Sequence, residues 1–328
     1  MAILVTGGAG YIGSHTVAAL LARNEEVVIA DNLYQGHKEA VLGGKLYVGD
    51  IRDSGFMDTI LRENRIEAVI HFAANSLVGE SMQNPAKYYH NNVYGTLCLL
   101  EKMTEYGVNK IVFSSTAATY GEPESVPIQE QDRTLPTNTY GETKLALEKM
   151  MKWFDAAQGV KYVSLRYFNA AGAHESGQIG EDHAPETHLI PLILQVPLEQ
   201  RKQISVYGDD YDTPDGTCIR DYLHVSDLAD AHILALESLR NGGNSNIYNL
   251  GSGTGFSVKE VIEVARKVTG HPIPMVMEAR RAGDPAVLIA SSDKIKAELN
   301  WSPKKDNMEA IIESAWNWHR SHPKGYGN

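Results

Sequence analysis

Short apolar segments alternate with segments of helical periodicity along the first half of the chain. The apolar segments are continuous rather than alternating, which is typical of strands buried on both faces of a parallel sheet. The predicted strands cover residues 2–6, 27–31, 46–49, 68–72, 110–114, 162–167 and, much later, 246–250. The predicted helices cover residues 12–23, 56–63, 85–106, 140–158, 225–240, 257–269 and 307–321. This alternation predicts an α/β fold with right-handed crossovers and a doubly wound (Rossmann) parallel sheet of about seven strands.

The pattern changes after Asn169, and residues 172–185 are rich in Gly, His, Glu and Asp. The chain has 328 residues, which is more than a single hydrophobic core usually supports. We therefore predict a Rossmann domain formed by residues 1–170 and rejoined by about 222–250. Residues 171–221 and 251–328 would form a smaller mixed α/β lobe. The sequence contains no linker, so the lobe is expected to pack onto the first domain.

Composition excludes several classes of function. Lys and Arg total 30 and Asp and Glu total 41, so the formal net charge is −11, which disfavours binding to nucleic acid. No apolar run reaches the roughly 18 residues that a membrane helix needs. The first residues lack the features of a secretory signal, and Cys98 and Cys218 form no Cys-x-x-Cys motif. We expect a soluble, cytoplasmic protein that binds neither nucleic acid nor a membrane.

Three glycines, Gly7, Gly10 and Gly13, lie between the first predicted strand and the first predicted helix. Glycine permits a tight turn, close approach of the backbone to a pyrophosphate, and close packing of helix on strand. Free amide groups at a helix N-terminus bind phosphate without a lysine side chain. The spacing Gly-x-x-Gly-x-x-Gly therefore predicts a dinucleotide-binding turn, although glycines in such turns also occur for packing alone.

Acidic residues follow the second and third strands. Asp31 ends the second strand, 18 positions after Gly13, where a carboxylate accepts hydrogen bonds from ribose hydroxyls. A carboxylate there would repel a 2′-phosphate, so the sequence favours NAD over NADP. Asp50 and Ile51 end the third strand and could flank the adenine, or could form a simple turn.

Tyr140 and Lys144 are four residues apart at the start of a predicted helix, so they share one face. A nearby ammonium and a nicotinamide cation would lower the pKa of a tyrosine from its usual value near ~10. A phenolate of that kind is a competent general base for an alcohol proton. Thr116 follows the fifth strand, where it could contact a substrate oxygen. The alternatives are a surface Tyr–Lys pair and, for Thr116, a cap or turn residue.

Together these motifs resemble the extended short-chain dehydrogenase/reductases that modify nucleotide sugars. The resemblance spans nearly the whole chain. The residues that carry it are 6–15, Asp31-Asn32, 49–52, 71–74, Tyr140–Lys144, 166–169, 219–225, 248–251 and 280–284.

The resemblance implies NAD-dependent 4-epimerisation of UDP-sugars, which interconverts UDP-glucose and UDP-galactose through a transient 4-keto intermediate. NAD would be tightly bound and regenerated in each cycle. Tyr140 would be the base, Lys144 its activator, and Thr116 the hydroxyl that assists proton transfer.

The resemblance also implies two sets of binding residues. The cofactor set is Gly7, Gly10, Tyr11, Ile12, Gly13, Asp31, Asn32, Asp50, Ile51, Phe72, Ala73, Ala74, Asn91, Ser114, Tyr140, Lys144 and Tyr167. The UDP-sugar set is Thr116, Tyr140, Phe168, Asn169, His188, Leu189, Ser205, Val206, Tyr207, Arg220, Arg281, Asp284 and Leu288. Within the second set Arg220 and Arg281 would bind the diphosphate, because guanidinium groups are bidentate donors. Surface ion pairing within the acidic lobe is their alternative role.

Two other functions are compatible with the same fold. Nucleotide-sugar dehydratases use an Asp-Glu pair where this chain has Ala117 and Ala118, which favours simple epimerisation. Another epimerase, or a non-catalytic NAD-sensing regulator, remains an alternative. The register from Gly283 and Asp284 places Leu288 where the family carries a bulky tyrosine near the sugar 2-position. A smaller side chain there predicts that UDP-N-acetylglucosamine and UDP-N-acetylgalactosamine are also accepted.

Two further expectations concern metals and assembly. His174, His183 and His188 are spread through a loop without metal-ligand spacing, so no metal is expected. The helix at 140–158 has an apolar arc wider than one core-facing stripe. The excess predicts a homodimer, in which this helix packs against the 85–106 helix of a second subunit. Burial under the chain's own C-terminal lobe is the alternative.

Overall fold

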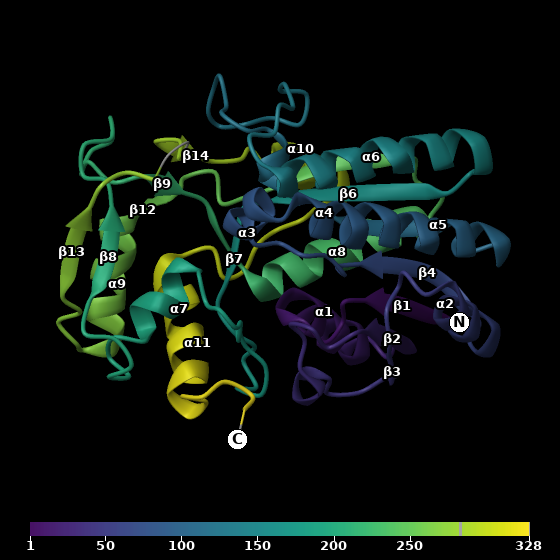
Figure 1. The fold of residues 1–328 in the computed structure, drawn as a ribbon, viewed down its shortest axis with the longest axis horizontal. Helices are drawn as coiled ribbons and strands as arrows, with labels where there is room; N and C mark the ends of the chain where they lie inside the picture. Colours follow the sequence, from purple (N-terminus) through teal and green to yellow (C-terminus); the bar gives the residue numbers. More distant parts are fainter. Residues whose placement is uncertain (282–283, 328) are drawn as a thin grey trace.

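A seven-stranded parallel sheet forms the larger part of the molecule, and a smaller lobe packs beside it (Figure 1). The computed structural model describes residues 1–281 and 284–327. In spatial order the strands are β11 (Asn246–Leu250), β6 (Lys161–Tyr167), β5 (Lys110–Ser114), β4 (Ile66–His71), β1 (Ala2–Thr6), β2 (Val27–Asp31) and β3 (Lys45–Val48). The predicted doubly wound α/β fold is confirmed. Each predicted strand is present, with ends that differ by at most two residues.

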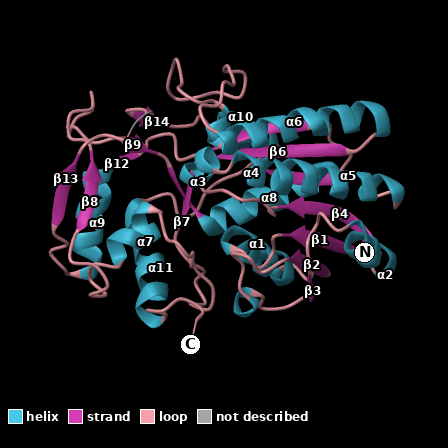
Figure 2. Cartoon of the chain, viewed as in Figure 1, coloured by secondary structure: helices cyan, strands magenta, loops and turns pink. Residues whose placement is uncertain are grey.

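Helices cover both faces of this sheet (Figure 2). The helices of this part are α1 (Tyr11–Ala22), α2 (Ser54–Glu63), α3 (Val78–Gln83), α4 (Pro85–Tyr88), α5 (Gly95–Glu105), α6 (Thr139–Gln158) and α8 (Val225–Arg240). Alternate residues of β1 separate the two cores: Ile3 and Val5 pack with α1 and α8, whereas Ala2 and Leu4 pack with α2, α5 and α6. The continuous apolarity of the strands follows from this burial on both sides.

The predicted helix at 85–106 is interrupted. Between α4 and α5 the backbone forms a π-helical turn, η2 (Tyr89–Tyr94). Its buried Asn92 accepts a hydrogen bond from the Asn75 amide at 2.8 Å and donates to the Thr143 hydroxyl at 3.1 Å. A π-turn widens the helix locally and often lies at a functional site, and here it fastens two neighbouring segments. The two short 3₁₀ turns are η1 (Lys38–Ala40) and η3 (Ala117–Thr119).

The smaller lobe has its own apolar core. Its helices are α7 (Leu189–Leu194), α9 (Val258–Thr269) and α11 (Met308–Ser321), whereas α10 (Asp293–Leu299) packs on β11 and α8 and contributes Ile295 to the Rossmann core. Its strands form short sheets: β7 (Asn169–Ala171) with β10 (Tyr222–His224), β8 (Ile204–Tyr207) with β13 (Met275–Glu278), and β9 (Ile219–Arg220) between β12 (Phe256–Ser257) and β14 (Val287–Leu288). Side chains of α7, α9 and α11 meet β8 in this core.

A buried carboxylate joins the two parts where the chain passes between them. Asp221 is fully buried, and one of its oxygens accepts hydrogen bonds from the amide and hydroxyl of Ser252, each at 2.6 Å. Its other oxygen accepts from the Ala290 amide at 3.1 Å. Because these partners lie on segments far apart in sequence, one side chain holds the end of β11 against the lobe. Among the described residues, no helix is both long and apolar enough to cross a membrane.

Candidate active site

A crevice of about 1170 Å³ lies between the carboxyl ends of the sheet strands and the lobe. In open α/β sheets, ligands bind beyond this edge. Its wall includes the whole predicted cofactor set: Gly7, Gly10, Tyr11, Ile12, Gly13, Asp31, Asn32, Asp50, Ile51, Phe72, Ala73, Ala74, Asn91, Ser114, Tyr140, Lys144 and Tyr167. From the predicted UDP-sugar set it includes Thr116, Tyr140, Phe168, Asn169, His188, Arg281 and Asp284.

The structure does not place the rest of the UDP-sugar set on this wall. These residues are Leu189, Ser205, Val206, Tyr207, Arg220 and Leu288. Val206 is fully buried in the apolar core of the lobe, so its side chain is not available to a ligand. The Arg220 guanidinium forms an ion pair with Asp284, and Leu288 lies beside Arg220 in the register of β9 and β14. A sequence motif identifies a strand but not which of its side chains faces the ligand. Ala282 and Gly283, which set the expected register of Leu288, lie outside the described residues.

The turn between β1 and α1 is built for close approach. Gly7 has φ +73°, and a Cβ there would lie 2.6 Å from the Ala73 amide nitrogen. A Cβ at Gly13 would lie 2.1 Å from the Gly7 carbonyl oxygen. Gly10 caps α1 without a side chain, and the first turn of the helix carries no acidic residue. The first amides of α1 therefore face the crevice and provide a site for an anion such as a diphosphate.

Two acids lie along the wall beyond that turn. Asp31 is 7% exposed, and its carboxylate accepts hydrogen bonds from the amides of Ala9 at 3.0 Å and Leu33 at 2.8 Å. Burial raises the pKa of Asp31, against the effect of these two amides. Asp50 has a different environment, because hydrogen bonds from Arg52 lower its pKa to about 2. Each carboxylate is fixed by neighbours and still borders the crevice, as an acceptor of hydroxyl hydrogen bonds must.

Tyr140 and Lys144 meet at the floor of the crevice. The side chain of Asn138 caps α6 through the Gly141 amide at 2.8 Å, which places Tyr140 in the first turn. Lys144 is 2% exposed, and its ammonium donates to the Ser114 carbonyl at 2.8 Å. The same ammonium lies 5.9 Å from the centre of the Tyr140 ring. Thr116 is 9% exposed and also accepts a hydrogen bond from the Ala118 amide at 3.2 Å, so it acts as a cap as well as bordering the crevice.

The protein alone shifts the pKa of Tyr140 in the direction opposite to that expected from sequence. Burial raises it to about 12, and contact with the Thr116 hydroxyl lowers it only in part. Burial also lowers the pKa of Lys144 to about 7, although Glu148 acts in the other sense. Lys144 is therefore a weak source of positive charge at neutral pH. A phenolate at Tyr140 needs an additional cation, which the sequence-based expectation included as the nicotinamide ring.

A buried ion pair supports this floor from behind. Glu148 lies one turn after Lys144 on α6 and binds the guanidinium of Arg166 on β6 at 2.5 and 2.9 Å. Its carboxylate also accepts from the Ser115 hydroxyl at 2.5 Å. Both charged side chains are at most 4% exposed. Such a pair is costly to bury, but it fixes the relative positions of α6, β6 and the end of β5.

A protein-family model described as the NAD dependent epimerase/dehydratase family matches residues 3–251. The UDP-glucose 4-epimerase of Halalkalibacterium halodurans is 63% identical over 326 residues, which cover 99% of this chain and 98% of that protein. The chain belongs to the NAD-dependent epimerase/dehydratase family.

Solved structures agree with this membership. A crystal structure of a UDP-glucose 4-epimerase is 58% identical, with a TM-score of 0.98 and coverage of 100% of both chains. The UDP-glucose 4-epimerase of Bifidobacterium longum, solved in complex with NAD⁺ and UDP, is 41% identical with a TM-score of 0.94. That alignment covers 99% of this chain and 100% of the other. The fold of this epimerase/dehydratase family member is therefore shared over its whole length.

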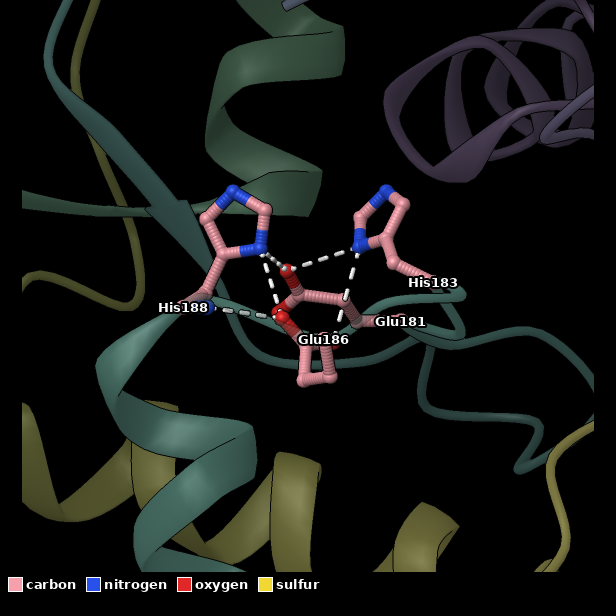
Figure 3. A group of neighbouring side chains, drawn as sticks. All are labelled: Glu181, His183, Glu186 and His188. Carbon is pink, nitrogen blue, oxygen red and sulfur yellow. Dashed lines mark hydrogen bonds and ion pairs between the residues drawn. The ribbon is translucent and has the colours of Figure 1, made fainter. Parts of the chain in front are cut away.

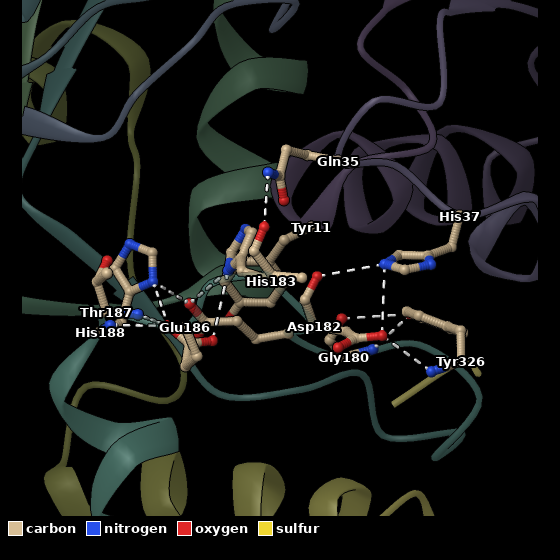
Figure 4. Close-up of polar contacts among 12 residues, drawn as sticks. Tyr11, Gln35, His37, Gly180, Asp182, His183, Glu186, Thr187, His188 and Tyr326 are labelled. Atoms are coloured by element: carbon tan, nitrogen blue, oxygen red, sulfur yellow. Dashed lines mark hydrogen bonds and ion pairs between the residues drawn. The ribbon is translucent and has the colours of Figure 1, made fainter. Parts of the chain in front are cut away.

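One part of the wall was not anticipated as a structural unit. Residues 180–188, which we call the strap, connect the Rossmann domain to the lobe (Figure 4). The Gln35 side chain donates to the Ala184 carbonyl at 3.1 Å, and His37 lies 3.4 Å from the Asp182 carboxylate. On the lobe side, the Tyr326 amide donates to the same carboxylate at 3.0 Å.

The strap also brings together the side chains of Glu181, His183, Glu186 and His188, which the sequence did not identify as a group. Burial opposes charge on both imidazoles, but Glu181 and Glu186 raise the pKa of His183 and of His188 above the usual histidine value. The signal that could have identified this cluster is a repeated Glu-x-His pattern, at 181–183 and 186–188.

The low pKa of Lys144 predicts a pH dependence of folding stability. Its folded pKa of about 7 lies below the usual lysine value of 10.5, so between these values the unfolded chain binds more protons. Lys144 therefore makes folding more favourable as pH rises through this window, by at most about 1.4 kcal/mol per pH unit. In urea unfolding of cofactor-free protein, wild type should gain stability relative to Lys144→Met between pH 7 and 9.5.

The matched control is Lys149→Met, which removes an exposed ammonium from the same helix. Its stability difference from wild type should be flat with pH. Titration of His183 and His188 acts in the opposite sense but is common to all three proteins, so it cancels in the differences. Parallel pH profiles for wild type and Lys144→Met would show that Lys144 titrates normally.

Proposed function

We propose that the chain catalyses NAD-dependent 4-epimerisation of UDP-sugars, interconverting UDP-glucose and UDP-galactose. The observation that carries the proposal is the meeting of Tyr140, Lys144 and Thr116 at the floor of a crevice that also contains a glycine-turn anion site. Membership of the epimerase/dehydratase family supports it, as does the full-length similarity to named UDP-glucose 4-epimerases. Ala117 and Ala118 take the positions at which dehydratases carry their additional acid and base.

The residues present fit NAD. Gly7 and Gly13 have no Cβ, so the turn packs closely against its neighbours and the first amides of α1 lie at the crevice edge, where a diphosphate would bind. Asp31 offers carboxylate oxygens to ribose hydroxyls and would repel a 2′-phosphate. When bound, NAD supplies a hydride acceptor that returns the hydride in the same cycle, so the net reaction is an isomerisation.

The chain's own residues handle the proton of the sugar 4-hydroxyl. Tyr140 in its phenolate form accepts this proton, and it returns the proton when the 4-keto group is reduced. The Thr116 hydroxyl borders the same space and can hold the substrate oxygen near the phenol. The Lys144 ammonium is held by its hydrogen bond to the Ser114 carbonyl. Its position beside Tyr140 therefore does not change as the substrate moves.

The UDP part of the substrate would provide most of the binding energy. Arg281 borders the crevice, and its guanidinium lies 4.1 Å from the centre of the Tyr207 ring, which fixes its direction. Phe168 and Asn169 also border the crevice, and the Asn169 side chain donates a hydrogen bond to the Asp221 carbonyl at 2.9 Å. Remote binding of this kind leaves the sugar free to turn between the two hydride transfers.

We also propose that the protein acts in the cytoplasm, where two unpaired buried cysteines are normal.

Replacement of the Tyr140 hydroxyl tests the proposed base. Tyr140→Phe should lower kcat for UDP-galactose by about 10²–10⁴-fold, because the general base is lost while the ring still fills its place. Bound NAD, measured after denaturation of the purified protein, should remain near the wild-type amount. Tyr162→Phe, on β6 away from the crevice, is the control and should keep wild-type turnover. Near-normal turnover of Tyr140→Phe would refute the role of Tyr140.

We further propose that N-acetylated UDP-sugars are substrates, because position 288 carries leucine rather than a bulky tyrosine. Leu288 is not part of the crevice wall itself, but it pairs with Arg220, whose guanidinium binds the crevice-lining Asp284. Wild type should therefore turn over UDP-N-acetylglucosamine. Leu288→Tyr should lower this turnover at least 10-fold relative to that of UDP-galactose, whereas Leu288→Met should not. No detectable turnover of the N-acetylated sugar by wild type at high enzyme concentration would end this proposal.

We propose a homodimer formed through the helices on the outer face of the Rossmann domain. Trp153 on α6 is 69% exposed, so the chain's own lobe does not cover it. Tyr89 and Tyr94 on the adjoining η2 segment are 46% and 47% exposed. Exposed aromatic side chains on neighbouring helical segments are typical of a protein interface.

Sedimentation measures this association directly. Wild type at micromolar concentration should sediment as a dimer, and Trp153→Lys should shift it toward monomer because a charge would be buried in the interface. Met275→Lys places the same charge at an exposed apolar position in the lobe and should remain dimeric. A monomeric wild-type protein would refute the dimer.

A further inference from the structure

Four side chains of the strap converge on one point. Glu181, His183, Glu186 and His188 come from an eight-residue stretch and direct one ligand-type atom each toward a common centre (Figure 3). These four atoms all lie within 4.8 Å of one another. Both imidazoles use the same ring atom, because each turns its Nδ1 toward the carboxylates and its Nε2 away (Figure 3).

The individual distances resemble the edges of a coordination polyhedron. The Nδ1 of His183 lies 3.4 Å from Glu181 and 3.6 Å from Glu186. The Nδ1 of His188 lies 3.0 Å from Glu181 and 2.8 Å from Glu186. Four ligands at zinc bond lengths in a tetrahedron would be about 3.3 Å apart. The observed distances lie on both sides of that value, so a small adjustment would seat one ion.

The buried Nδ1 of His183, whose neighbours are the two carboxylates at ion-pair distance, adds a second observation. His183 Nδ1 is completely covered by protein and makes no hydrogen bond among the described residues. It nevertheless points at the two carboxylates, of which Glu181 is 5% and Glu186 10% exposed. A buried nitrogen of this kind normally has a partner, so its orientation toward the centre of the cluster favours a ligand there.

We propose that Glu181, His183, Glu186 and His188 form a binding site for one divalent cation of the Zn²⁺ type. Two imidazole nitrogens and two carboxylate oxygens are a zinc-like donor set, whereas Mg²⁺ and Ca²⁺ prefer oxygen ligands alone. The two carboxylates neutralise the ion. In its absence, protons on the two imidazoles supply the same two positive charges. Metal binding is therefore an exchange of one divalent cation for two protons, without a change in net charge.

The position of the cluster indicates what the ion would do. Four protein ligands fill a tetrahedral site, which is typical of a structural metal rather than a catalytic one. The strap contacts Gln35 and His37 on one side and Tyr326 on the other (Figure 4). The rings of His183 and Tyr11 pack edge to face, with their centres 6.2 Å apart. The ion would thus fix the conformation of the strap, whose His183 ring packs against the Tyr11 ring in the turn that begins α1. His188 also lines the crevice with its side chain 44% exposed, so the site is compatible with a role for His188 toward substrate.

Co²⁺ tests the site on tag-free, NAD-loaded protein, because its d–d absorption reports coordination independently of activity. After treatment with a chelator, wild type should bind one equivalent of Co²⁺ with visible bands of a tetrahedral nitrogen and oxygen site. Zn²⁺ should displace it and should raise Tm, since a ligand bound only by the folded state stabilises that state. Absence of stoichiometric Co²⁺ binding by wild type would overturn the proposal without any variant.

Variants locate the ion. Glu186→Gln keeps the side-chain shape but removes a ligand charge, so Co²⁺ affinity should fall at least 10-fold and the Zn²⁺-dependent rise in Tm should disappear. His174→Gln removes an imidazole from the same loop region outside the cluster and should bind Co²⁺ as wild type does. Equal Co²⁺ spectra and affinities for wild type and Glu186→Gln would overturn the site. If Glu186→Gln does not fold, His183→Gln provides the same comparison.

Discussion

The crevice depends on how closely the turn after β1 approaches its neighbours. A side chain at Gly7 would collide with the backbone of Ala73, and one at Gly13 would collide with the Gly7 carbonyl. This closeness brings the first amides of α1 to the sheet edge, where they have no hydrogen-bond partner among the described residues. Tyr11 belongs to the same turn, and its hydroxyl donates to the Gly172 carbonyl at 2.6 Å. The close packing of this turn therefore positions both the first amides of α1 and the Tyr11 hydroxyl that binds the chain at Gly172, near the start of the lobe.

Charge is handled locally rather than by the net charge of −11. Under the proposed function, backbone amides would bind one anionic group and the crevice-lining Arg281 the other, so neither would need a basic surface. Inside the protein, Lys144 forms no ion pair with a carboxylate of any described residue, and burial accordingly lowers its pKa to about 7. Glu148 is close enough to oppose this shift but is itself committed to Arg166. The floor is thus nearly neutral on its own, which leaves its protonation sensitive to a bound cation.

Sequence predicted the strands well because burial on both faces leaves a continuous apolar run, as in β1. It did not predict the π-turn around Asn92, because the groups that satisfy this residue are the backbone of Asn75 and the hydroxyl of Thr143, both far away in sequence. The position of Tyr140 beside Lys144 on one helix was predicted correctly, but the sign of its pKa shift depends on burial, which periodicity does not report. The strap cluster was missed for a related reason. Its ligand atoms converge only through the path of the folded backbone.

The number of proton carriers at the floor limits the reaction that can occur there. Ala117 and Ala118 carry no dissociable proton, and the Ser114 hydroxyl is already hydrogen-bonded to that of Tyr167. Elimination of water from a sugar requires a base and a separate acid, whereas moving one proton away and back requires a single group. In the proposed reaction, the Tyr140 phenol on one side of the crevice can serve both faces of C4 only if the sugar turns. The proposal therefore requires a crevice that holds the nucleotide firmly and the sugar loosely, as binding energy concentrated on UDP would allow.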